Sequence, residues 1–182
     1  MEDRQNYEAY CRGDDDGLAR IISDYKDSLI FFLRTFTGDI HTAEDAAEET
    51  FVKLAVKKPR YNGKASFKTW LYKIASNTAI DLLRKKRLET LPLEDAELSS
   101  DEADLEESYI REAKKIAVHR AMRELPEDYQ RILWLVYFEG LSLKDAAVLM
   151  DRSEHAAQTL VSRARQRMKE VLDQKGFKYE EL

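Results

Sequence analysis

Apolar residues recur every three or four positions along most of this chain, the spacing that places them on one face of an α-helix. The first such run consists of Leu18, Ile21, Ile22, Tyr25, Leu29, Phe32, Leu33 and Phe36. Turn-forming residues are too scarce for many short strands, because the 182 residues include only six Gly and three Pro. The pattern predicts an all-α protein and disfavours the sheet classes.

Local signals divide this periodicity into separate helices. Gly38 is expected to end the first helix. Thr42, with Asp45 three residues later, has the spacing of a helix cap, and Pro59 closes the second helix. Ser66 is the expected N-cap of a third helix that begins with an aromatic residue.

Charge is distributed unevenly along the chain, although the net charge is only −5. Residues 1–52 hold thirteen acidic and five basic residues, whereas residues 53–87 hold one acidic and eleven basic residues. Residues 88–110 hold nine acidic residues and no basic one. Residues 89–107 also have few apolar side chains, so burial cannot offset their ordering entropy, and we expect a flexible acidic linker there. The predicted architecture is therefore two small helical domains, 1–88 and 108–182, joined by that linker.

The second domain contains a predicted helix-turn-helix. Ser142 and Asp145 form a Ser-x-x-Asp cap for a short helix, residues 151–153 form a polar turn, and a longer helix begins near Glu154. In this arrangement the first turns of the second helix enter the major groove of DNA. The side chains expected to reach bases or phosphates there are Glu154, His155, Gln158, Thr159, Ser162 and Arg163, with Arg165 and Arg167 further along for phosphates or another protein surface. From spacing alone, a charged amphipathic terminal helix without DNA contacts stays an open alternative.

A basic segment interleaved with aromatic residues precedes the linker. It contains Arg60, Tyr61, Lys64, Phe67, Lys68, Trp70, Tyr72 and Lys73. Cations along a backbone and rings for base stacking are what single-stranded nucleic acid requires. Helical spacing places Phe67, Trp70 and Leu71 on the core side, so we expect Trp70 to pack in the core. The run from Arg84 to Arg87 exceeds what a solvated helix end needs.

Other function classes have weaker support. Cys11 is the single cysteine and His41, His119 and His155 are scattered, so we expect no disulfide, no metal site and no cofactor. The polar N-terminus and the absence of a run of about eighteen apolar residues indicate a cytoplasmic protein that does not insert into a membrane.

Three stretches resemble the extracytoplasmic-function (ECF) sigma factors of bacterial RNA polymerase over nearly the whole chain. Residues 42–51, TAEDAAEETF, resemble the family's "AEDxxQETF" stretch, and residues 67–84 resemble its "FxxWLYxIAxNxxxDxxR" stretch. Residues 125–131, LPEDYQR, and residues 137–142, YFEGLS, resemble the start of the family's second DNA-binding domain.

The resemblance implies a transcription initiation factor without catalytic chemistry of its own. It implies that residues to about 88 bind core RNA polymerase and the minus-10 promoter element, and that residues from about 108 bind the minus-35 element. The polymerase surface would comprise Asp45, Glu48 and Glu49. The opened strand at minus-10 would be held by Tyr61, Asn62, Lys64, Lys73, Asn77, Asp81, Arg84 and Lys85. The resemblance also implies an anti-sigma protein as a regulator.

The sequence departs from the family pattern in two places. Glu48 stands where the family more often has Gln, a change that an acidic surface tolerates. In the recognition helix, Gln158 and Leu160 replace a Lys and an Arg, so the minus-35 contacts are expected to be weaker or differently specific.

Two rival hypotheses stay open on the residues alone. One is a polymerase-independent, dimeric helix-turn-helix regulator with an N-terminal sensor domain. The other is an enzyme that uses Asp45, Glu48 and Glu49 as paired carboxylates, although no His partner or Gly-rich phosphate loop accompanies them.

Overall fold

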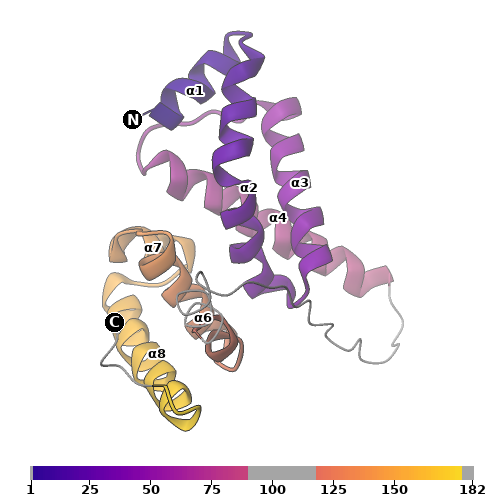
Figure 1. Cartoon of the computed structure of the whole chain (residues 1–182). Helices are drawn as coiled ribbons and strands as arrows, with labels where there is room; N and C mark the ends of the chain where they lie inside the picture. Colours follow the sequence, from indigo (N-terminus) through magenta and orange to yellow (C-terminus); the bar gives the residue numbers. More distant parts are fainter. Residues whose placement is uncertain (1, 90–117, 178–182) are drawn as a thin grey trace, which may run out of the picture. The chain divides into compact units, whose positions relative to one another are not determined.

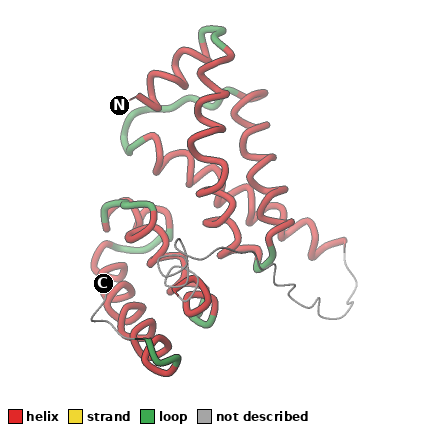
Figure 2. The backbone as a smooth tube through the Cα atoms, viewed as in Figure 1, coloured by secondary structure: helices red, strands yellow, loops and turns green. Residues whose placement is uncertain are grey.

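The computed structural model describes residues 2–89 and 118–177, and within these ranges all regular structure is helical. The chain divides into two compact units, Met1–Glu94 and Asp95–Leu182. Figures 1 and 2 show that each unit is a small bundle of helices joined by short loops. The predicted all-α class is confirmed.

In residues 2–89 the first unit contains four helices: α1 (Glu2–Cys11), α2 (Asp15–Thr37), α3 (Ile40–Lys57) and α4 (Phe67–Glu89). Helices α2 and α3 lie side by side and α4 packs against both, whereas α1 lies along the first turns of α2 (Figure 1). The side chains that fill the centre come from α2, α3 and α4. They include Ile21, Leu29, Phe32, Leu33, Leu54, Leu71 and Tyr72.

The cap at the start of α3 differs from the sequence prediction. Gly38 ends α2 as expected, with φ 79° and its N–H donating to Arg34 O over 2.9 Å. Asp39 is the N-cap of α3, because its Oδ1 accepts a hydrogen bond from the Thr42 N–H over 2.7 Å. The prediction that Thr42 caps this helix is therefore wrong. Thr42 lies inside the first turn and is buried.

The junction between α3 and α4 follows the local signals. Helix α3 ends at Lys57, and Lys58 adopts a left-handed conformation with φ 41° just before Pro59. Ser66 Oγ accepts a hydrogen bond from the Thr69 N–H over 3.0 Å, which confirms it as the cap of α4. The loop of residues 58–66 between them runs from the end of α3 towards α1 (Figure 2), where Tyr7 donates a hydrogen bond to Pro59 O.

The second unit contains helical residues 118–123, then α6 (Glu127–Leu133), the π-helical turn η1 (Trp134–Phe138), α7 (Leu143–Leu149) and α8 (Glu154–Gln174). The cap predicted at Ser142 is confirmed, since Ser142 accepts from the Asp145 N–H. Helix α8 begins at Glu154 as predicted, and its N-cap is Ser153, which accepts from the Ala156 N–H. The π-helical turn was not predicted from the sequence.

Small residues let α7 and α8 approach each other, as the helix-turn-helix prediction requires. Ala146 and Ala147 on α7 are buried, as are Ala157 and Ala164 on α8. The polar turn between the helices contains Asp151 with φ 56°. The helix-turn-helix geometry is thus present in the second unit.

The predicted acidic linker, residues 89–107, lies outside the described residues except for Glu89, the last residue of α4. Of the second predicted domain, the structure describes residues 118–177. The predicted boundaries of the two domains stay predictions. None of the described helices combines the length and the apolar character needed to cross a membrane.

Candidate nucleic-acid interface

The outer face of α4 carries polar side chains at helical spacing. Lys73, Asn77, Asp81 and Arg84 recur every three or four residues, opposite the buried side that contains Leu71. Asn77, Asp81 and Arg84 are exposed, and Lys73 is partly exposed. Four of the residues predicted for the minus-10 element therefore share one accessible face.

An ion pair holds the charged groups near the end of this face. Arg84 Nη2 lies 3.2 Å from Asp81 Oδ1, one turn earlier. The Arg84 side chain is 74% exposed, so most of its guanidinium stays available to a phosphate. Lys85 is exposed on the adjoining side of the helix.

Aromatic rings gather where the loop of residues 58–66 meets α4. The Tyr61 ring lies 5.3 Å from the Trp70 ring and 5.7 Å from the Phe67 ring, measured between centroids. Phe67 is buried, whereas Tyr61 and Trp70 are partly exposed. The core prediction for Trp70 therefore holds for only part of its surface, and its other part lies beside the loop.

Tyr72 does not belong to this accessible set. Its side chain is 0% exposed and its ring packs 4.9 Å from Phe32. Its hydroxyl is hydrogen-bonded to Ser28 Oγ at 3.0 Å. The expectation that Tyr72 offers a ring to an unpaired base is wrong, because helical spacing turns it towards α2.

The loop itself exposes polar groups. Asn62 and Lys64 are exposed, and Asn62 Oδ1 accepts a hydrogen bond from the Lys64 N–H over 3.1 Å. The Tyr61 hydroxyl donates to the Ala65 carbonyl. The structure therefore brings the three predicted loop residues together at the start of α4.

Sequence reasoning missed the contribution of α1 to this region. Tyr7 of α1 packs its ring against Trp70 at 5.1 Å and Phe67 at 5.6 Å, and its hydroxyl donates to Pro59 O over 2.7 Å. Burial raises the pKa of the Tyr7 phenol above its ordinary value, so the hydroxyl keeps its proton and acts as a donor. The sequence signal was weak, because two tyrosines in a polar stretch of ten residues do not define an apolar face.

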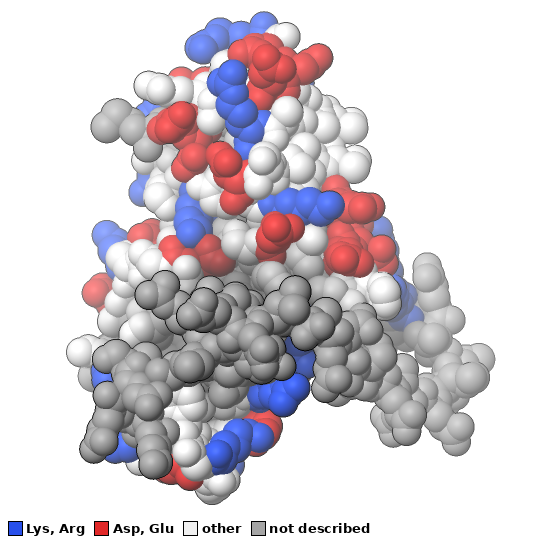
Figure 3. Space-filling view, in the orientation of Figure 1, with Lys and Arg blue, Asp and Glu red and all other residues white. Residues whose placement is uncertain are grey.

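A second surface of the first unit follows the outer side of α3. Asp45 and Glu48 are exposed, whereas Glu49 is partly covered and lies 3.2 Å from Lys53 Nζ. The same side continues with two valines, Val52 and Val56, which are 56% and 77% exposed. Acidic side chains cluster over the helices of the first unit, with single Lys and Arg side chains between them (Figure 3).

The mixed character of this stripe was missed from the sequence. Val52 lies one turn beyond Glu48 and faces outward with Val56. An exposed face with carboxylates at one end and apolar side chains at the other is typical of a protein-binding surface.

All of the residues predicted to contact the minus-35 element are exposed on α8. They are Glu154, His155, Gln158, Thr159, Ser162, Arg163, Arg165 and Arg167. The buried side of the helix is formed by Ala157, Ala164 and Val171. The helix therefore turns its polar side outward along four turns.

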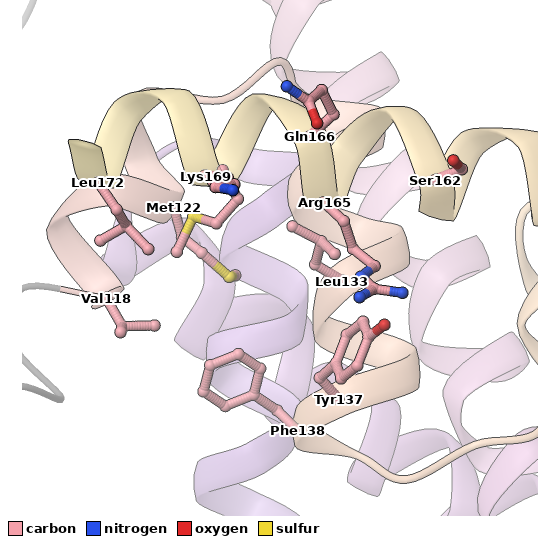
Figure 4. Close-up of a pocket in the computed structure, with 11 residues that line it drawn as sticks. Val118, Met122, Leu133, Tyr137, Phe138, Ser162, Arg165, Gln166, Lys169 and Leu172 are labelled. Carbon is pink, nitrogen blue, oxygen red and sulfur yellow. The ribbon is translucent and has the colours of Figure 1, made fainter. Parts of the chain in front are cut away.

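The last two arginines of this set have different surroundings. Arg165 lines a cavity of about 770 Å³ whose apolar walls include Leu133, Tyr137 and Phe138, and Figure 4 shows its guanidinium beside the Tyr137 ring. Arg167 forms an ion pair with Glu170 at 3.0 Å. Arg163 is exposed and lies with Tyr129 and Arg167 around a second cavity, of about 490 Å³.

Comparisons with known proteins agree on both units. Residues 21–89 match the family Sigma-70 region 2, and residues 115–168 match the family Sigma-70, region 4. The RNA polymerase sigma-H factor of Pseudomonas aeruginosa is 30% identical over 94% of this chain and 94% of its own length. The ECF RNA polymerase sigma factor SigM of Bacillus subtilis is 32% identical over 80% of this chain and 88% of its own length.

The fold is also found in a solved structure, the co-crystal of the sigma factor RpoE with the anti-sigma factor NepR from Bartonella quintana. The similarity covers 85% of this chain and 96% of that chain, with a TM-score of 0.62 and 22% sequence identity.

Proposed function

Because this chain belongs to the ECF group of RNA polymerase sigma factors, we propose that its exposed surfaces divide promoter recognition between α4 with its loop and α8. As an alternative sigma factor, it binds core RNA polymerase and directs it to promoters. The order of the two matched regions disfavours a polymerase-independent dimeric regulator.

The observation that carries the proposal for the first unit is the junction of an exposed polar helix face with partly exposed rings. Lys73, Asn77 and Arg84 line α4, and the loop places Tyr61 beside Trp70. Cations and amides hold a phosphate backbone and base edges, while a ring accepts an unpaired base. We therefore assign the opened non-template strand of the minus-10 element to this junction.

The same junction would also help to melt promoter DNA. Taking a base out of the duplex stack costs a few kcal/mol, which contacts in a pocket and base stacking must return. Stacking on one ring contributes about 1–3 kcal/mol. Stacking at Tyr61 returns part of this cost, and contacts from Asn62 and Lys64 add to it, so capture of one base favours the open state.

The outer stripe of α3 is the proposed contact with core polymerase. Asp45, Glu48 and Glu49 supply the charge, and Val52 and Val56 supply apolar area that a partner can bury. Apolar area at the centre of an interface with charges around it is the usual composition of specific contacts. The carboxylates are then binding groups, and we propose no catalytic chemistry for this chain.

In the second unit, α8 is the proposed reader of the minus-35 element. His155, Gln158 and Thr159 lie in the first two turns, which reach furthest into the major groove in helix-turn-helix proteins. Ser162 and Arg163 follow on the same side, with Arg163 suited to a phosphate.

We also propose an anti-sigma protein as a partner and the cytoplasm as the place of action, where polymerase and DNA are found. The RpoE structure with NepR supports the first point by its fold.

The test is transcription in vitro with core polymerase and a library of randomised promoters. We expect this chain to co-purify with core polymerase and to enrich promoters with defined minus-35 and minus-10 sequences. A chain that leaves start-site selection unchanged, or that gives a discrete footprint on duplex DNA without polymerase, would contradict the proposal.

A further inference from the structure

The loop of residues 58–66 has almost no backbone support of its own. In the part of the chain that the structure describes, residues 59–65 form no hydrogen bond between two backbone groups. Pro59 has no N–H to contribute. The conformation of the loop therefore depends on side chains that bond to its backbone.

Two of these side chains belong to the loop and one does not. Tyr61 donates to Ala65 O, and Asn62 accepts from the Lys64 N–H, so both close local turns. Tyr7 comes from α1, more than fifty residues away, and donates to Pro59 O over 2.7 Å. Local turns shape the loop, and the Tyr61 ring packs on Phe67 and Trp70 of α4. Lys58, at the start of the loop, donates to Tyr10 O, and the Tyr7 hydroxyl adds a hydrogen bond from α1 to the backbone of the loop.

The helix that carries Tyr7 is itself held against the bundle. Gly17 of α2 packs so close to α1 that a Cβ there would lie 2.2 Å from Asn6 O. The Tyr10 hydroxyl donates to Ala55 O over 2.8 Å, and the Tyr25 hydroxyl donates to Asp3 Oδ2 over 2.8 Å. Because α1 is held at these points, the hydrogen bond from Tyr7 to Pro59 O acts as a tether that fixes the loop to a rigid helix.

The ring of Tyr7 completes the arrangement. It lies between the loop and α4, 5.1 Å from Trp70, which in turn contacts Tyr61 at 5.3 Å. The Tyr7 side chain is 2% exposed, so it is not itself available to DNA. Its influence on a bound strand must pass through Pro59 and the rings beside it.

We infer that Tyr7 is a positioning residue for the minus-10 junction, holding the loop in the geometry in which Tyr61, Asn62 and Lys64 meet an unpaired base. The inference rests on the proposed function of that junction. Its physical basis is preorganisation, since a loop that is already ordered loses less entropy when the strand binds. When the loop is free to shift, we expect the protein to discriminate less well between the preferred base and other bases at the captured position.

The substitution Tyr7→Phe isolates the tether, because it removes the hydroxyl and keeps the ring that packs on Trp70. Tyr25→Phe is the matched control: it removes a partly buried hydrogen bond that holds α1, but this bond does not involve the loop. Both variants should retain the fold, which thermal unfolding of the full chain will verify.

Binding is measured with holoenzyme and a fluorescent single strand that carries the minus-10 element selected by the wild-type protein. A second strand carries a different base at the position most sensitive to substitution. We expect Tyr7→Phe to reduce the ratio of the two affinities about fivefold, the effect of one net hydrogen bond. Tyr25→Phe should leave the ratio within about twofold, whatever its effect on the melting temperature.

The ratio is the decisive reading, because a purely structural role lowers the melting temperature without changing base discrimination by the folded protein. An unchanged ratio in Tyr7→Phe, or an equal fall in both variants, would overturn the inference while leaving promoter selection by the wild type intact. Failure of the proposed function is recognised separately, by a wild-type holoenzyme that selects no minus-10 sequence.

Discussion

The indole N–H of Trp134 donates a hydrogen bond to Glu139 Oε1 over 2.8 Å, across the π-helical turn η1. Both residues are buried, and the Trp134 ring stacks on Phe138 with centroids 4.6 Å apart. The Glu-Gly-Leu-Ser segment leads into the helix-turn-helix. It thus begins with a buried carboxylate that accepts a hydrogen bond from Trp134 of the preceding turn. This contact fixes the direction in which the chain leaves η1 towards α7.

Replacing Glu139 therefore should destabilise the second unit. Glu139→Ala leaves the buried Trp134 N–H without this acceptor, which costs about 1–3 kcal/mol of unfolding free energy. Glu139→Gln keeps an acceptor oxygen and should cost less than half as much. Urea unfolding followed by tryptophan fluorescence measures both, and equal losses in the two variants would show that the acceptor is not the important feature.

The N-cap of α3 should make stability depend on pH in the acidic range. Burial opposes ionisation of Asp39, but the hydrogen bonds from Thr42 and the nearby charges of Lys86 and His41 outweigh it and hold the Asp39 pKa below its ordinary value. A carboxyl whose pKa is lowered on folding adds stability above its unfolded pKa of about 3.9. That stability is lost as the pH falls through the folded pKa.

The variants Asp39→Asn and Asp39→Ala separate the charge from the cap. Asn keeps the capping oxygen without titrating, so the stability advantage of the wild type over Asp39→Asn should shrink between about pH 5 and pH 2.5. Asp39→Ala removes the cap and should cost about 1 kcal/mol at neutral pH. Chemical unfolding at several pH values measures the difference, and a constant advantage over Asn would contradict the assigned shift.

Helix boundaries were predictable where the signals are local. Gly38, Ser66 and Ser142 each act through a partner within four residues, so short sequence patterns identify them. The error at Thr42 has the same origin, because Asp39 is an equally good cap residue and spacing alone does not decide between them.

Features that depend on distant contacts were not predictable. Helix α1 owes its place to the hydroxyls of Tyr7 and Tyr10, whose acceptors lie 52 and 45 residues away. The burial of Tyr72 depends on Phe32 and Ser28 of α2. Periodicity predicted which helix faces are apolar, but it did not predict which polar groups form hydrogen bonds at those faces.

The valines on α3 should contribute to binding of core polymerase. The double variant Val52→Ala with Val56→Ala removes apolar area that a partner can bury, so we expect about a tenfold loss of affinity for core polymerase. The free energy of unfolding should change little, because both side chains are mostly exposed. Val148→Ala, at a 53% exposed position on α7, is the control. Equal affinities of the double variant and the wild type in a titration of labelled protein would exclude these valines.

Charge reversal at the end of α4 should act on DNA more than on polymerase. Arg84→Glu with Lys85→Glu places two carboxylates on the face assigned to the opened strand, so formation of the open complex should fall at least tenfold. Binding to core polymerase should fall by much less. Permanganate footprinting and a polymerase titration give the two quantities. The control Arg12→Glu with Arg20→Glu makes the same change of net charge at exposed positions near α1 and on α2, and equal losses of open complex in both double variants would indicate a general charge effect.

Two arginines of α8, one helical half-turn apart, should differ in their effect on the minus-35 element. Both side chains are exposed, but Arg165 lines the apolar cavity with Tyr137, whereas Arg163 lies outside that cavity. Each phosphate contact lowers the slope of log affinity against log salt by about 0.9. Arg163→Ala should therefore reduce the magnitude of the slope for holoenzyme on a promoter fragment by about one. Arg165→Ala should leave the slope unchanged, because we expect a guanidinium that lines the cavity beside Tyr137 to make no phosphate contact. Equal reductions in the two variants would place both side chains on phosphates, and the cavity wall would then have to open when DNA binds.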